Sequence, residues 1–91
     1  GVASGINESQ NALGIQLLSN PVKQSLEIRS EENFREAELK IFNAEGRLMN
    51  SKNIYLNTGA NFFDVNSLQA GIYFLKISSE NKSSSIRFVK L

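Results

Sequence analysis

The stretch Ser67–Ile77 constrains the fold more than any other part of the sequence. Leu68 and Gly71 prepare a corner, and from Ile72 onward apolar, aromatic or β-branched residues occupy nearly every position. Glycine tolerates backbone conformations that suit a corner leading into a strand. The apolar run after it predicts a central strand that is covered on both faces or lies deep in a sandwich.

Tyr73 lies directly after this expected corner. Its ring can enter the core while its hydroxyl reaches back to a backbone group ahead of the strand. This is the geometry of the tyrosine corner in immunoglobulin-like sandwiches. The residues therefore predict a core strand with a tight turn before it.

The rest of the chain alternates between short apolar segments and turn residues. Strands with one buried face are expected at 25–29 and 37–42, and Gly46 is expected in the left-handed conformation of a hairpin turn. Further strands are expected at 15–18, at 62–65 and at 86–91, with loops at 30–36 and 78–85. Another is expected at 47–56, with a break at Asn50–Ser51 that a β-bulge can span. About seven short antiparallel strands of this kind predict an all-β, immunoglobulin-like β-sandwich.

Two segments near the start of the chain are expected to lie outside the sheets. Residues 1–14 are rich in Gly, Ser, Asn and Ala, which predicts a flexible linker before a folded domain at 15–91. Asn20 is expected to close a turn on its own backbone, and Pro21 fixes φ and removes a hydrogen-bond donor.

The composition argues against catalysis. The 91 residues include neither histidine nor cysteine, which removes the commonest general base, metal ligand and thiol nucleophile. Asp64 is the only aspartate, and no spacing places it beside a glutamate as a catalytic pair. We therefore expect no enzyme activity, no catalytic residue, no metal site and no cofactor.

The distribution of charge and apolar residues excludes two further classes of partner. The net charge is +1, and the acidic cluster within Glu31–Glu38 predicts a solvated rim. The basic residues of the second half stand singly, without the aromatic residues of a nucleic-acid platform. No apolar run approaches the roughly 20 residues that cross a bilayer. We expect neither nucleic-acid binding nor membrane insertion.

Four pieces of the chain, taken in order, resemble one protein family. Leu17–Val22 resembles its opening Y-P-N-P segment, with Leu18-Ser19 in place of Tyr-Pro, and Leu39–Leu48 resembles its v-x-i-y-n-x-x-G-x-x-v hairpin. Leu68–Ile77 resembles its L-x-x-G-x-Y-x-v-x-i strand, and Phe88–Leu91 resembles its short basic ending, with Leu91 added after the lysine. The family is the type A C-terminal sorting domain of the type IX (Por) secretion system, found in Gram-negative bacteria of the Bacteroidetes group.

The resemblance implies that this domain is a sorting signal attached to a larger protein. Family members follow a cargo domain, fold as sandwiches in the periplasm, and are recognised by the outer-membrane translocon and its shuttle protein. A sortase then cuts on the N-terminal side of the domain, and the cargo stays at the cell surface or is secreted. On this reading residues 1–14 hold or adjoin the cleavage site.

A folded signal must present a surface that varied cargo cannot supply. The sorting-motif candidates are Asn20, Pro21, Gly46, Leu68, Gly71, Tyr73, Lys90 and Leu91. For Gly46, Gly71 and Tyr73 the competing interpretation is that they only hold the fold. The edges of the two sheets offer a further route, because they can pair with a partner strand or with a second copy.

Two other functions stay open at this point. An immunoglobulin-like adhesion or carbohydrate-binding module would present at least two of Tyr55, Phe62 and Phe63 as exposed, coplanar rings. A structural spacer domain would carry a substantial apolar patch on one face.

Overall fold

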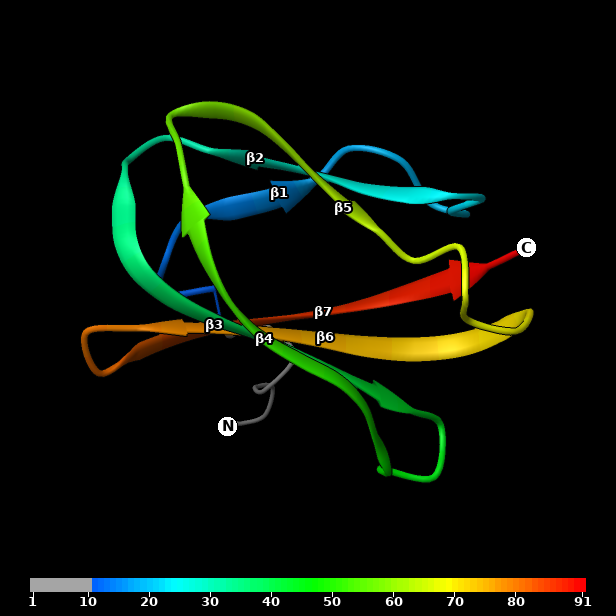
Figure 1. The fold of residues 1–91 in the computed structure, drawn as a ribbon. Coiled ribbons are helices and arrows are strands. Elements are labelled where there is room, and N and C mark those ends of the chain that lie inside the picture. Colours follow the sequence, from blue (N-terminus) through cyan, green and yellow to red (C-terminus); the bar gives the residue numbers. More distant parts are fainter. Residues whose placement is uncertain (1–10) are drawn as a thin grey trace, which may run out of the picture.

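The computed structural model describes residues 11–91, which form two antiparallel sheets packed face to face (Figure 1). In the first sheet the order is β1 (Ile15–Leu17), β2 (Ser25–Ser30) and β5 (Gly59–Asp64). In the second it is β4 (Leu48–Leu56), β3 (Phe34–Asn43), β6 (Gly71–Ser79) and β7 (Lys82–Lys90). The all-β sandwich is confirmed, and β4 joins the sheet of β3, β6 and β7 as in immunoglobulin-like domains. Nothing in residues 11–91 forms a helix of the length and apolarity that a membrane crossing requires.

The core lies between the two sheets and follows from the alternation of side chains along each strand. Leu26 and Ile28 point inward from β2, while Leu39 and Ile41 point inward from β3. From the other strands the buried side chains include Leu56, Tyr73, Leu75, Ile77 and Phe88. Buried and exposed side chains therefore alternate along the strands, as the period of two predicts, although the buried side chain of β5 is the polar Asn61.

Tyr73 forms the expected corner at the start of β6. Its hydroxyl donates a hydrogen bond of 2.8 Å to the carbonyl oxygen of Gln69. Its ring stacks on Phe88 of β7, with 5.6 Å between the ring centroids. Leu68 is buried in the same corner. The predicted tyrosine corner is confirmed.

Of the two expected arrangements of β6, coverage on both faces is wrong, whereas β6 is a central strand of the sandwich, between β3 and β7. Tyr73, Leu75 and Ile77 are buried, but Ile72 and Phe74 lie on the opposite face with 40% and 42% of their surface exposed. Because both faces of β6 carry apolar residues, the sequence from Ile72 to Leu75 is continuously apolar although only one face is buried.

Several expected strand limits also change, and β5 begins at Gly59 rather than at residue 62. The loop at 30–36 shortens to 31–33, because Phe34 is buried and already belongs to β3. The loop at 78–85 shortens to Glu80–Asn81, whose φ angles of 52° and 68° suit a two-residue hairpin turn. β4 runs through Asn50–Ser51 without a break, and its bulge lies at Met49 instead, since Ile41 pairs with Asn50 and Phe42 pairs with Leu48.

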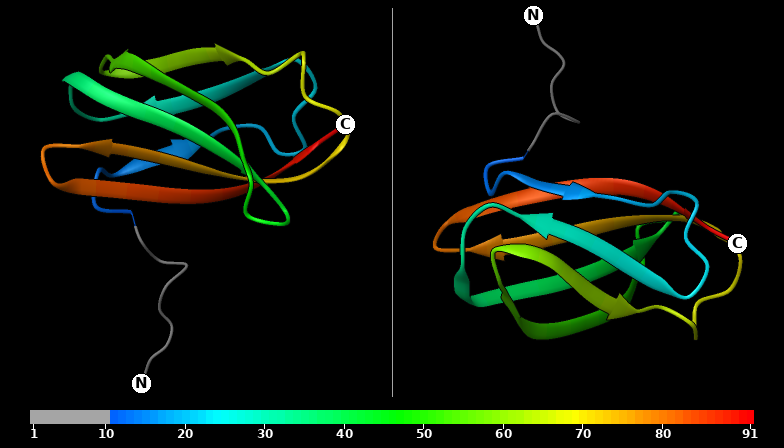
Figure 2. Two further views of the ribbon diagram at one scale, coloured as in Figure 1. Left: turned by 60° about the horizontal axis from the view of Figure 1, so that its bottom comes forward. Right: turned by 90° about the horizontal axis from the view of Figure 1, so that it is seen from above.

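The pairing registers place the loops at two opposite ends of the sandwich (Figure 2). One end carries the Glu31–Asn33, Asn57–Thr58 and Glu80–Asn81 turns. The other end, which we call the corner end, carries residues 18–24, 43–47 and 65–70 together with Lys90 and Leu91.

Candidate functional site

The corner end brings together every sorting-motif candidate. Gly71 pairs with Lys90, and Tyr73 stacks on Phe88 two residues before it. Asn20 and Pro21 lie beside the end of β7, and Gly46 lies at the tip of the β3–β4 hairpin at the same end (Figure 1). The structure gathers these residues at one end, and their part in sorting stays a prediction.

Asn20 hydrogen-bonds to β7, so the expected turn on its own backbone is wrong. Its Oδ1 accepts a hydrogen bond of 3.0 Å from Val89 N, and its Nδ2 donates one of 3.3 Å to Arg87 O. The side-chain amide thus occupies the place of a neighbouring strand on the edge of β7. The following peptide bond, Asn20–Pro21, is cis.

Val22 continues the cover of this edge. Its N–H donates a hydrogen bond of 2.7 Å to Val89 O, and its carbonyl accepts one of 2.8 Å from Leu91 N. Val22 and Lys90 form a parallel bridge. The end of β7 is therefore held between β6 on one side and the Asn20–Val22 segment on the other.

Lys90 and Leu91 differ sharply in accessibility. Lys90 is only 6% exposed, and its Nζ donates a hydrogen bond of 3.0 Å to the carbonyl oxygen of Leu91. Leu91 is 56% exposed. Of the two terminal candidates, Leu91 is the side chain that a partner can reach directly.

The β3–β4 hairpin presents Gly46 to solvent. Asn43 orders the turn, because its Oδ1 accepts hydrogen bonds from the N–H groups of Glu45 and Arg47 at 3.0 and 2.9 Å. Gly46 has φ of +85°, as predicted, and no atom lies within 4 Å of the position that a Cβ would occupy. The turn needs glycine for its backbone, while the space around it is open.

Tyr55, Phe62 and Phe63, the candidates for sugar stacking, do not form one platform. Tyr55 and Phe62 are exposed, but Tyr55 lies on the outer side of the four-stranded sheet and Phe62 on the outer side of the three-stranded sheet. Phe63 points inward, partly buried against the core, with Lys52 Nζ 5.8 Å from its ring centroid. The coplanar pair that sugar stacking needs is not formed by these residues.

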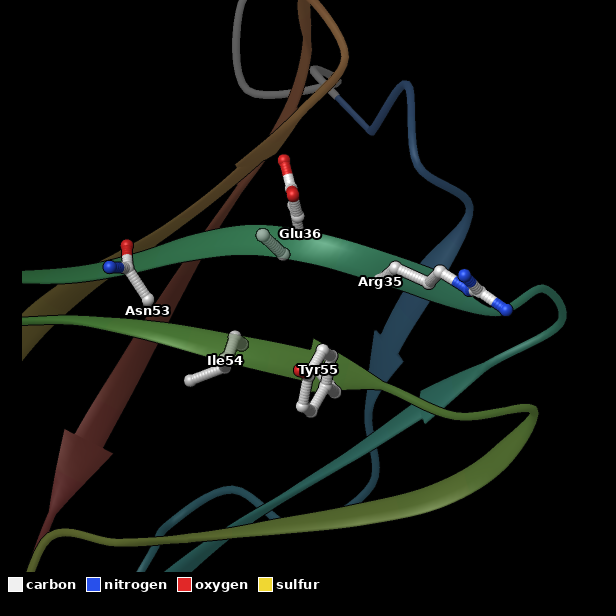
Figure 3. A pocket seen from close by; sticks show the side chains of 6 residues that line it. Arg35, Glu36, Asn53, Ile54 and Tyr55 are labelled. Atoms are coloured by element: carbon white, nitrogen blue, oxygen red, sulfur yellow. The ribbon is translucent and has the colours of Figure 1, made fainter.

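An open pocket of about 440 Å³ lies where β3 bulges away from β4, and Tyr55 lines it with Arg35, Glu36, Ala37, Asn53 and Ile54 (Figure 3). Arg35 and Glu36 leave the strand in different directions, so their charged groups do not converge on a ligand. Among residues 11–91 no three His, Cys, Asp or Glu side chains are placed to share a metal ion.

The sheet edges differ in how well they are covered. Ala12 N donates to Ser83 O at 3.1 Å, so residues before β1 cover the start of β7 while Asn20 and Val22 cover its end. β4 and β5 each lie at the margin of their sheet, with one paired neighbour in the described part of the chain. Pairing of two copies through such an edge stays a prediction.

One feature of the corner end was not predicted from sequence. Ile72 and Phe74 share the outer face of the four-stranded sheet with Phe42, Leu48 and Val89, all at least partly exposed. The sequence does contain the pattern: Ile72 and Phe74 are apolar and alternate with the buried residues of β6. It could be recognised only once the strand was known to have a solvent face.

The fold and this end define a small β-sandwich whose distinctive surface is built from turns, a strand edge and exposed apolar side chains, as suits a recognition domain. The family model described as the secretion system C-terminal sorting domain matches residues 17–91, so the chain belongs to that family. The type IX resemblance found in the motifs is thereby confirmed. The family is one of sorting signals for export to the cell surface or medium. A search of the curated proteins found no match.

Proposed function

We propose that this chain directs a cargo protein that precedes it through the outer membrane by the type IX secretion system. The observation that carries the proposal is the family match, which spans residues 17–91 and hence every strand from the end of β1 onward. The domain acts as a folded sorting signal in the periplasm, where the shuttle protein and the translocon recognise it. It performs no chemistry of its own.

The corner end supports recognition in the folded state. Asn20, Val89 and Leu91 come from opposite ends of the sequence, and only the folded sandwich brings them together. A surface assembled in this way is absent from an unfolded domain. The translocon can therefore distinguish a protein whose sorting domain is folded from one whose sorting domain is unfolded.

We also propose that a sortase removes the domain by cutting before Asn11. Residues 1–10 of the predicted linker lie outside the described part of the chain, whereas Asn11–Gly14 are held against β7. Leu13 is buried, its N–H donates to Ser84 Oγ at 3.0 Å, and Ala12 N–H donates to Ser83 O at 3.1 Å. Proteases need an accessible, extended substrate. The bond that is cut therefore precedes this docked segment.

The proposal is tested by fusing a periplasmic reporter to residues 1–91 in a host with a working type IX system. A second fusion carries an unrelated immunoglobulin-like sandwich, and a third carries Phe88→Ala, which removes a fully buried ring. If only the first fusion is delivered to the surface and trimmed, the result supports a sorting signal that is recognised in its folded state. A first fusion that folds but stays in the periplasm would overturn the proposal.

A further inference from the structure

The outer side of the four-stranded sheet carries a cluster of apolar side chains next to the corner end. Phe42 is paired with Phe74 on one side and with Leu48 on the other, and Ile72 is paired with Val89. Leu48, Phe42 and Phe74 therefore lie in one row across β4, β3 and β6. Ile72 and Val89 form the next row across β6 and β7, on the same side of the sheet. Leu48, Ile72 and Phe74 are 48%, 40% and 42% exposed. We call these five residues the outer apolar face.

Two cations lie beside this face. Arg87 is paired with Phe74, and Lys76 follows Phe74 on the same side of β6. Within residues 11–91 the ion pair on this side of the sheet joins Lys40 and Glu38 at 3.7 Å. Lys76 and Arg87 thus remain available to a partner.

The outer side of the other sheet is a natural comparison. There Phe62 is paired with Glu27, and the neighbouring outward positions Ser25 and Arg29 are polar. An isolated exposed ring is ordinary on a protein surface, whereas a contiguous apolar patch with a polar rim marks an interaction site. The asymmetry between the two outer sides assigns the interaction to the four-stranded sheet.

We propose that the outer apolar face docks a protein of the export machinery whose surface has an apolar centre and carboxylates at its rim. This inference rests on the proposed function and adds the surface that is recognised. Carboxylates opposite Lys76 and Arg87 would complement their charge, and apolar residues opposite Phe74 would exclude water from its ring.

Three other occupants fit the face less well. A second copy placed symmetrically on it would bring together two surfaces that both carry Lys76 and Arg87 and, within residues 11–91, no unpaired acid in the same rows of the sheet, which is unfavourable. A lipid surface is contacted best by protruding side chains, whereas Ile72 and Phe74 lie within a sheet and are more than half covered. A structural spacer domain would use such a patch to pack on the preceding cargo. The cargo, however, joins the domain through Asn11, which pairs with Ser84 near the opposite end of the sandwich.

The test uses the reporter fused to residues 1–91 and three double variants. Ile72→Thr with Phe74→Thr removes apolar surface and keeps β-branched residues on the strand. Lys76→Glu with Arg87→Glu reverses the charge, and Lys76→Arg with Arg87→Lys preserves it. Phe62→Thr is the matched control on the other sheet. Thermal unfolding of each purified fusion shows whether the variant folds.

The Thr double variant and the Glu double variant are expected to fold but to be delivered about tenfold less than the wild type. This is the size of the effect that loss of a central interface contact has on binding. The charge-preserving variant and Phe62→Thr should be delivered like the wild type. Equal delivery of all folded variants would overturn this inference while the proposed function stands, whereas failure of the wild-type fusion would remove the proposed function itself.

Two measurements on the purified wild-type domain test the rival occupants. Light scattering that shows a dimer, made monomeric by Phe74→Thr with Ile72→Thr, would assign the face to a second copy and overturn the inference. Flotation with phosphatidylglycerol vesicles, lost on reversing Lys76 and Arg87, would assign it to an anionic membrane and overturn it likewise. A monomer that does not float agrees with a protein partner.

Discussion

The Oδ1 atom of Asn20 accepts a hydrogen bond of 3.0 Å from the N–H of Val89, although the two residues are 69 positions apart in the sequence. Together with the bond from Nδ2 to Arg87 O, it completes the edge of β7 without a paired strand. Uncovered edges invite pairing with other chains. Asn20, which the sequence suggests as a turn former, therefore satisfies two backbone groups on the edge of β7 that could otherwise pair with another chain.

Replacing Asn20 by alanine should lower the free energy of unfolding by about 1 kcal/mol, because two hydrogen bonds are lost but water can reach the freed groups. Urea unfolding of the purified domain measures this change. Ser19→Ala, one residue earlier and exposed, is the control and should stay within about 0.5 kcal/mol of the wild type. Equal values for the two variants would show that the edge bonds add no stability.

Replacing Tyr73 by phenylalanine removes the 2.8 Å hydrogen bond to Gln69 O and leaves the ring on Phe88. We expect a loss of about 1 kcal/mol, whereas Tyr73→Ala should cost about 3–5 kcal/mol by emptying part of the core. Tyr55→Phe, at an exposed ring, is the control and should change little. A Tyr73→Phe domain as stable as the wild type would contradict a structural role for the hydroxyl.

The same variant separates folding from recognition at Tyr73. The ring is buried and its hydroxyl is bonded within the domain, so a partner gains little from it. A reporter fused to the Tyr73→Phe domain should therefore be delivered normally while its unfolding midpoint falls. Loss of delivery at unchanged stability would instead place Tyr73 in the recognition surface.

Local chemistry made much of the fold predictable from sequence. The alternation in 37–42, the glycine of the β3–β4 turn and the Leu68–Tyr73 corner each act over a few residues, and each appears as expected. The serines of β7 show the limit of this reasoning. Ser83–Ser85 have weak strand preferences, yet they belong to the strand because β6 pairs with them and Leu13 packs beside Ser84.

Long-range contacts explain what sequence reasoning missed at the candidate site. The bond from Asn20 to Val89 depends on the fold placing two distant segments side by side, and no local pattern encodes it. The apolar run of β6 does not reveal the solvent face of Ile72 and Phe74, because hydrophobicity alone does not distinguish a buried residue from an exposed binding residue. The outer apolar face became visible only with the strand order.

Gly46 should be replaceable at a cost set by its backbone alone. At φ of +85° an alanine is strained, by about 1–2 kcal/mol, whereas asparagine tolerates this region better and should cost less. Because no atom lies within 4 Å of the added Cβ, steric conflict adds nothing. Urea unfolding gives the two costs. Stability in the reverse order, with Gly46→Ala above Gly46→Asn, would contradict a backbone requirement.

The docked segment before β1 predicts where the released cargo ends. In the wild-type fusion, mass spectrometry of the secreted reporter should find a C-terminus at or before residue 10, because Ala12 and Leu13 are bonded to β7. Ser84→Ala removes the hydroxyl that accepts from Leu13 N and donates to Asn11 Oδ1 at 2.7 Å. It should loosen this segment and add products that end within 11–14, whereas Ser85→Ala, at an exposed neighbour, should not. A wild-type product that ends beyond Leu13 would show that the sortase first opens the domain.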